Sequence, residues 1–164
     1  MRKLNVHRLV RDLNNLCENL DNQYDVNCGG CCFVAYEIAK HLDRFNIEYS
    51  LCIANTYPLD KVAINKEVIN KQSNKIGRYS VTGENSCNHY YIRIKGGGSI
   101  NFGDFYDYYI YSINKINCKH IKWIYENSLW NDIYDIRYNK LIKRNINFYF
   151  NGIRKTQIRF YKNS

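Results

Sequence analysis

The residues best suited to chemistry lie in two short stretches of the sequence, "NCGGCC" (residues 27–32) and "NHYYIRIKGGGSINFGD" (residues 88–104). The first contains three of the seven cysteines beside two glycines, and the second contains His89, Asn101 and Asp104. A thiol becomes an effective nucleophile when a histidine accepts its proton and a third group orients that histidine. This set of residue types predicts a cysteine nucleophile with a histidine base.

Cys31 is the cysteine whose position fits a nucleophile. A helix is predicted from Cys31 to about Phe45, with an apolar stripe at Val34, Ile38 and Leu42. Cys31 extends that stripe into the first turn, so we expect it to face the sheet, with Cys28 and Cys32 as flanking packing residues. A helix N-terminus favours a thiolate and its N–H groups can hold an oxyanion. Gly29 and Gly30 permit a tight entry into the helix.

His89 is the predicted base, because it lies early on the first strand of a predicted hairpin. The second strand carries Asn101, and Asp104 follows just after it; either can orient the imidazole. A turn centred near Gly97 places His89 opposite about Phe105, which favours Asp104 by proximity. Both candidates therefore stay open on spacing alone.

The remaining elements predict one α+β domain over residues 1–164, with helices packed on an antiparallel sheet. We expect a first helix over 2–20, a strand over 47–54, a long connection over 55–84 and hairpin strands over 87–94 and 99–102. The segment after Asp104 is expected to be helical in part, with strands as a competitor, and a closing strand is expected near 152–161.

The net charge of +9 is concentrated near the C-terminus, since no acidic residue follows Asp135. The basic residues beyond it are Arg137, Lys140, Lys143, Arg144, Arg154, Lys155, Arg159 and Lys162. This end suits weak contact with nucleic acid or an acidic partner, although a solvated basic face explains it more simply. Charges interrupt the N-terminal segment and no window is apolar enough to span a membrane, so we expect a soluble protein without a signal peptide, in a reducing cytoplasm.

The stretch "CGGCCFVAYEIAKHL" resembles the nucleophile helix of the papain-like cysteine peptidase superfamily, and "NHYYIRIKGGGSIN" is similar to its histidine block. The resemblance implies Cys31 as nucleophile, Cys28 as the structural cysteine, His89 as base and an Asn or Asp after the turn as third member; motif position favours Asn101 over Asp104. It implies hydrolysis of a peptide, isopeptide or side-chain amide without a cofactor. The same order occurs in transglutaminase-like and arylamine N-acetyltransferase proteins, so acyl transfer is the alternative reaction.

The position six residues before the nucleophile, where the superfamily usually has an oxyanion glutamine, is Asp25 here. Gln23, Asn27 or backbone N–H groups are the possible substitutes. The chain also resembles small papain-fold proteins of phages and their hosts, and its richness in Asn, Ile, Lys and Tyr is typical of an AT-rich genome. A non-catalytic binding or virion-associated protein of the same fold is therefore a further alternative. Oligomeric state has no signal in the sequence.

A zinc site is the main competing interpretation of the cysteines. Cys28, Cys31, Cys87 and His89 form a Cys3His set compatible with tetrahedral zinc. A redox disulfide between Cys28 and Cys31 lacks the preceding strand that such motifs usually have. The simplest alternative is that Cys31 is a small buried residue of the core.

Overall fold

The computed structural model describes residues 5–27, 30–55, 88–126 and 138–153, and these residues form an α+β structure. The expected connection over 55–84, apart from Asn55, and most of the expected closing strand lie outside them. The described elements are α1 (Val6–Tyr24), α2 (Cys31–Arg44), β1 (Tyr49–Asn55), β2 (Asn88–Ile94), β3 (Gly98–Ile100), β4 (Tyr109–Ile113), α5 (Cys118–Glu126) and α6 (Asn139–Asn151). The predicted α+β class, the first two helices and the hairpin are confirmed.

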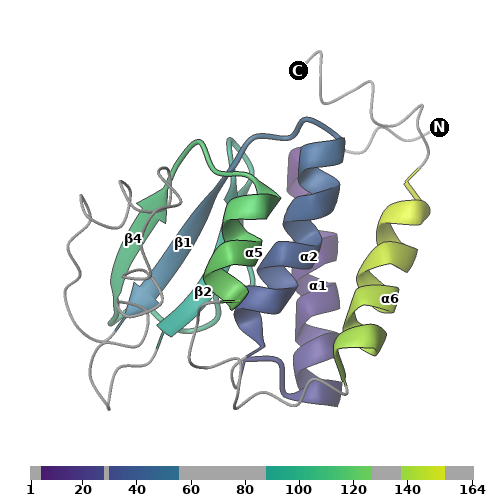
Figure 1. The fold of residues 1–164 in the computed structure, drawn as a ribbon, viewed down its shortest axis with the longest axis horizontal. Helices are drawn as coiled ribbons and strands as arrows, with labels where there is room; N and C mark the ends of the chain where they lie inside the picture. The colour runs from purple at the N-terminus through teal and green to yellow at the C-terminus, as the bar shows by residue number, and fades with distance from the viewer. Residues whose placement is uncertain (1–4, 28–29, 56–87, 127–137, 154–164) are drawn as a thin grey trace.

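The described strands form one antiparallel sheet in the order β3-β2-β1-β4. In Figure 1 the helices stand together on one side of this sheet, with α2 between α5 and α6. Residues alternate between the two faces of a strand. On β2, Tyr90 and Ile92 therefore belong to the core under the helices, whereas His89 and Tyr91 face the other side. That second face carries a smaller aromatic cluster, including Phe105.

α2 is the central helix because apolar side chains surround it almost completely. Its predicted stripe of Val34, Ile38 and Leu42 is buried, with at most 1% of each side chain exposed. Each such side chain contributes about 1.5–3 kcal/mol when it is removed from water. The first residue of this helix is consequently fixed against the sheet.

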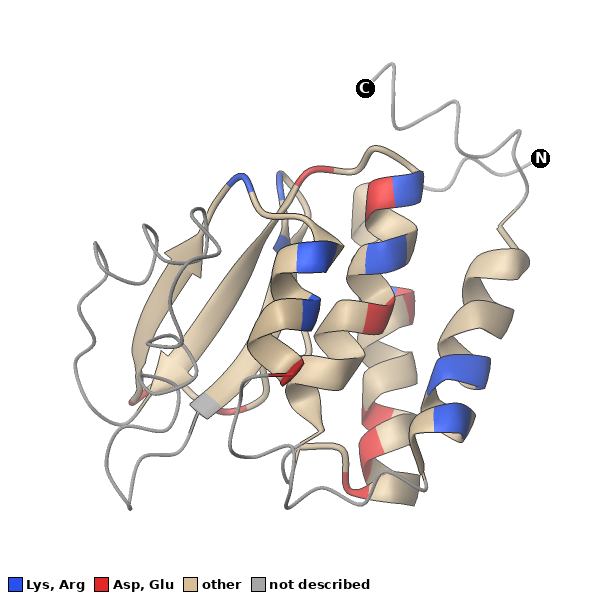
Figure 2. Ribbon diagram, in the orientation of Figure 1, with Lys and Arg blue, Asp and Glu red and all other residues tan. Residues whose placement is uncertain are grey.

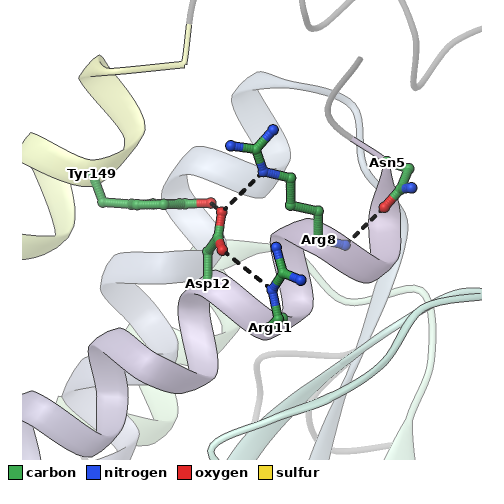
Figure 3. A network of polar contacts seen from close by, with 5 residues as sticks. All are labelled: Asn5, Arg8, Arg11, Asp12 and Tyr149. Carbon is green, nitrogen blue, oxygen red and sulfur yellow. Dashed lines mark hydrogen bonds and ion pairs between the residues drawn. The ribbon is translucent and has the colours of Figure 1, made fainter. Parts of the chain in front are cut away.

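α1 is held at both its N-terminus and its outer face by polar contacts. The side chain of Asn5 caps the helix by accepting a hydrogen bond from the Arg8 N–H at 2.8 Å. Figure 3 shows how Asp12 connects this helix to α6: its Oδ2 accepts from the Tyr149 hydroxyl at 3.3 Å and lies 3.7 Å from the Arg8 Nε. Such half-exposed ion pairs contribute little to stability. The contacts of Asp12 join α1 to α6, and the apolar faces of the helices form the core.

The hairpin turn differs from the predicted one. Ile94 pairs with Gly98, so the turn is centred on Gly96, and β3 ends at Ile100. The predicted pairing of His89 with Phe105 is therefore wrong in register. The cause is the positive φ of Gly96 (73°) and Gly98 (111°), which closes the turn one residue earlier than expected.

The segment after Asp104 contains both of the structures that its composition allows. The edge strand β4 comes first, and α5 and α6 follow within the described residues. Figure 2 shows lysine and arginine positions on α2, α5 and α6. On α6 the basic residues Lys140, Lys143 and Arg144 are exposed. The other C-terminal basic residues lie outside the described ranges. None of the described helices is long and apolar enough to cross a membrane.

Candidate active site

Cys31 lies at the first turn of α2, with its sulfur against the sheet, as the helical periodicity predicts. Its side chain is 4% exposed, and its Sγ accepts a hydrogen bond from the backbone N–H of Tyr90 at 3.5 Å. N–H groups alternate in direction along a strand. The Lys95 N–H points to β1, so the Tyr90 N–H points to the opposite side, where β3 has already ended. The sulfur thus accepts the hydrogen bond that a backbone carbonyl of a neighbouring strand would otherwise accept.

This contact brings Cys31 next to His89, the residue that precedes Tyr90. The Tyr90 nitrogen lies about 2.5 Å from the His89 Cα, so the sulfur lies within about 6 Å of that Cα. The His89 ring itself points to the face of the sheet away from α2 and is 1% exposed. The predicted nucleophile and the predicted base therefore both lie at the edge of β2, with the His89 ring on the face away from α2.

The His89 ring is held by one hydrogen bond and one stacked ring. Its Nε2 is hydrogen-bonded to the backbone carbonyl oxygen of Asn101, and it stacks on Phe105 with centroids 4.3 Å apart. Because a carbonyl only accepts, the proton resides on Nε2 and the lone pair on Nδ1. Among the described residues Nδ1 has no hydrogen-bond partner, so no hydrogen bond joins it to Cys31 here. The ring carries the proton arrangement that a base needs.

Asn101 contacts His89 through its main chain and uses its side chain elsewhere. Its backbone has a φ of 66°, in the left-handed region that asparagine tolerates. Its N–H donates to the Asn14 Oδ1 at 2.8 Å, and its Nδ2 donates to the Asn27 Oδ1 at 3.2 Å. Sequence reasoning found the residue but expected the side chain to orient the histidine.

The electrostatic environment favours a neutral His89 and a protonated Cys32. Burial lowers the pKa of His89 below its ordinary value of 6.5, and the Asn101 carbonyl and the charge of Asp21 oppose this shift without reversing it. Burial, and then the charge of Cys31, raise the pKa of Cys32 well above its ordinary value. A neutral imidazole can accept a proton near pH 7, whereas Cys32 stays a thiol.

The other predicted site residues are placed as follows. Asp104 is exposed and makes no hydrogen bond with His89, and Gln23 is exposed near the end of α1. Asn27 is half-buried, and its N–H donates to the Asp21 Oδ1 at 2.8 Å. Cys28 and Cys87 lie outside the described residues. Within the ranges that the structure describes, no three His, Cys, Asp or Glu side chains are arranged to hold a metal ion.

Two residues of the hydrogen-bond network around Asn101 and Asn27 are not predicted from the sequence. Asn14 and Asp21 lie on α1, and both are half-buried beside its apolar stripe. A polar residue one helical turn after the buried Val10, at the position of Asn14, is the signal that points to it. Asp21 gave no comparable signal, because polar residues are common in the last turn of a helix.

No protein-family model matches the sequence, and neither the curated proteins nor the solved structures contain a significant match.

Proposed function

We propose that the protein is a papain-like cysteine hydrolase that acts on a peptide, isopeptide or side-chain amide. Cys31 is the nucleophile and His89 is the base in this proposal. The observation that supports it best is the hydrogen bond from the Tyr90 N–H to the Cys31 sulfur, because it brings the thiol beside a buried histidine whose proton is held on Nε2.

The reaction follows from these positions. His89 Nδ1 takes the thiol proton as Sγ attacks the substrate carbonyl, and the resulting imidazolium returns that proton to the leaving amine. The carbon–nitrogen bond breaks and a thioester remains on Cys31. Water then hydrolyses the thioester with His89 as base again; if an amine arrives instead, the same thioester gives acyl transfer. The Asn101 carbonyl accepts the Nε2–H throughout and stabilises the imidazolium.

Formation of the Sγ–Nδ1 hydrogen bond requires a rearrangement, because the His89 ring lies on the face of the sheet away from α2. Sγ is bound by the Tyr90 N–H in this structure, and catalytic hydrogen bonds commonly tighten only when substrate is present. Rotation of the Cys31 side chain at the edge of β2 moves the sulfur toward the imidazole. The Tyr90 N–H is a ready donor to the thiolate before it attacks.

The oxyanion is assigned to the N-terminus of α2 and to Asn27. The N-cap residue Gly30 offers no side-chain hydrogen bond to the first turn of this helix. Asn27 accepts through Oδ1 from Asn101, which leaves its Nδ2 group as the donor toward a substrate. Gln23 is the alternative donor, and reaching the site from its exposed position requires movement of the end of α1.

A non-catalytic binding protein is the second candidate function. It is favoured by the burial of Cys31, whose 4% exposed side chain leaves a substrate little access in this conformation. In that case Cys31 is a core residue that satisfies a strand N–H, and His89 is a packing residue between Asn101 and Phe105.

Trapping of the acyl intermediate distinguishes the two functions. The full-length protein is mixed at pH 7.0 with an activated thioester, such as an acetyl thioester, and the acetylated residue is located by mass spectrometry. Hydrolysis predicts an adduct on Cys31 that the variant C31A lacks, that C118A retains, and that accumulates at least tenfold more slowly in H89A. Equal acetylation of Cys31 and Cys118, unaffected by H89A, overturns the proposal.

A further inference from the structure

We propose that Asn14 of α1 is a positioning residue that fixes the imidazole of His89 by acting through Asn101. The inference rests on the proposed function for its effect on Cys31, but the contacts and their effect on His89 can be tested independently. Asn14 does not touch His89 or Cys31 in the contacts that the structure describes.

Asn14 uses both ends of its side-chain amide on the chain just after the hairpin. Its Nδ2 donates to the Ser99 carbonyl at 2.9 Å and its Oδ1 accepts from the Asn101 N–H at 2.8 Å. Ile100 pairs with Ile92 of β2, and backbone groups alternate in direction along a strand. The Ser99 carbonyl and the Asn101 N–H therefore point away from β2, toward the outer edge of β3. The side chain of Asn14 thus pairs with β3 as the backbone of a neighbouring strand would.

This pairing occurs where the backbone is about to leave the sheet. Asn101 adopts a left-handed conformation, which a non-glycine residue keeps only when its surroundings hold it. Asn14 holds its N–H, and Asn27 holds its side chain. With these two contacts made, the carbonyl of Asn101 is directed at the Nε2 of His89.

Asn14 on α1 therefore fixes the position of His89 indirectly, through Asn101. If Asn14 is truncated, Asn101 can relax out of the left-handed conformation and its carbonyl rotates away. His89 then loses the partner that selects the Nε2–H tautomer and that stabilises its imidazolium. The imidazole becomes a mixture of tautomers, only one of which leaves Nδ1 free to accept a proton.

The experiment is nitrogen NMR of the histidine rings, which reports the tautomer and titration of His89 without requiring activity. N14A is compared with N15A, which changes the adjacent exposed asparagine of the same helix. We expect N14A to lose the pure Nε2–H signature of His89 and to lower its pKa further, with N15A unchanged. N14D keeps the acceptor for the Asn101 N–H and should retain the Nε2–H tautomer.

Alkylation of Cys31 in the same variants separates this inference from the proposed function. N14A should slow it by roughly 10- to 100-fold, the cost of a misplaced base. A folded N14A protein with wild-type tautomer and pKa of His89 overturns the positioning role. If N14A changes the tautomer of His89 but not the alkylation rate of Cys31, the positioning role of Asn14 is upheld. The same result overturns the proposed pairing of Cys31 with His89. If N14A does not fold, N14Q, which displaces the same amide by one methylene, gives the same comparison.

Discussion

The imidazole of His89 is hydrogen-bonded to the main-chain carbonyl of Asn101, and the side chain of Asn101 points instead to Asn27. Every residue type has a main-chain carbonyl, so the chemical contribution of position 101 depends on its backbone conformation. The left-handed φ of 66° is what an asparagine at this position supplies. Substitutions should therefore be ranked by backbone preference, not by side-chain chemistry.

Asn101→Gly and Asn101→Val test this ranking. Glycine adopts the left-handed conformation without strain, so N101G should retain the tautomer of His89 and lie within about 1 kcal/mol of wild type in unfolding free energy. Valine resists that conformation, and N101V should lose about 1–3 kcal/mol. Denaturant unfolding measures both. If the Asn101 side chain oriented His89 directly, N101G would disturb the His89 tautomer as much as N101V does.

His41 makes stability depend on pH. Its ring stacks on Phe150 at 4.3 Å and its Nε2 hydrogen-bonds the Asn147 Oδ1 at 2.7 Å, so it joins α2 to α6. Burial lowers its pKa below 6.5; the Asn147 bond opposes this, Arg44 and Lys40 lower it further, and Glu37 raises it.

The sign of this dependence follows from proton uptake. The unfolded chain binds a proton at a higher pH than the folded protein, so the unfolding free energy is complete above about pH 6.5 and falls as the pH drops toward the folded pKa. His89, whose pKa is also lowered, adds a loss of the same sign. Denaturant unfolding between pH 8 and pH 5 should show a shallower loss in H41F than in wild type, and H7N, which changes an exposed histidine, should behave as wild type. A wild-type slope in H41F contradicts this role.

Gly97 and Val6 form a contact between the hairpin turn and α1. A Cβ on Gly97 would lie 1.9 Å from the Val6 Cγ1, a distance at which the Val6 side chain or the backbone must shift. G97A should therefore destabilise the protein by about 1–3 kcal/mol. V6A removes the obstructing methyl, so the double variant should recover most of that loss. Simple addition of the two single losses in thermal or denaturant unfolding would show that the helix and the turn are not in contact.

Metal content tests the zinc alternative directly. Two of its four ligands, Cys28 and Cys87, lie outside the described residues. The hydrolase proposal predicts far less than one zinc per chain in purified protein and no loss of thermal stability on treatment with a chelator. One zinc per chain that is lost in both C28A and H89A would assign Cys31 to a metal site.

Local periodicity was enough to predict the elements that carry the site. The apolar stripe of α2 placed Cys31 against the sheet, and the glycine-rich turn between two β-branched and aromatic runs predicted the hairpin that carries His89. These are short-range properties, and the packing of Val34, Ile38 and Leu42 reinforces them.

Long-range geometry was not predictable in the same way. The end of β3 at Ile100 and the left-handed turn at Asn101 depend on Asn14, which is 87 residues distant in the chain. The face occupied by His89 depends on strand register, and a shift of one residue would have reversed it. The sequence therefore predicts where Cys31 and His89 lie in the fold, but not the contacts through which they are held.

The rate at which Cys31 is alkylated, relative to Cys118, tests the central claim most directly. Cys118 is the more exposed thiol, although burial and Asp43 raise its pKa to about 11. With iodoacetamide at pH 7.0 and peptide mapping, a Cys31–His89 pair predicts that the buried Cys31 reacts first and that H89A slows it by about 100-fold while Cys118 is unaffected. Labelling of Cys118 ahead of Cys31, with the Cys31 rate unchanged in a folded H89A protein, would contradict the pairing.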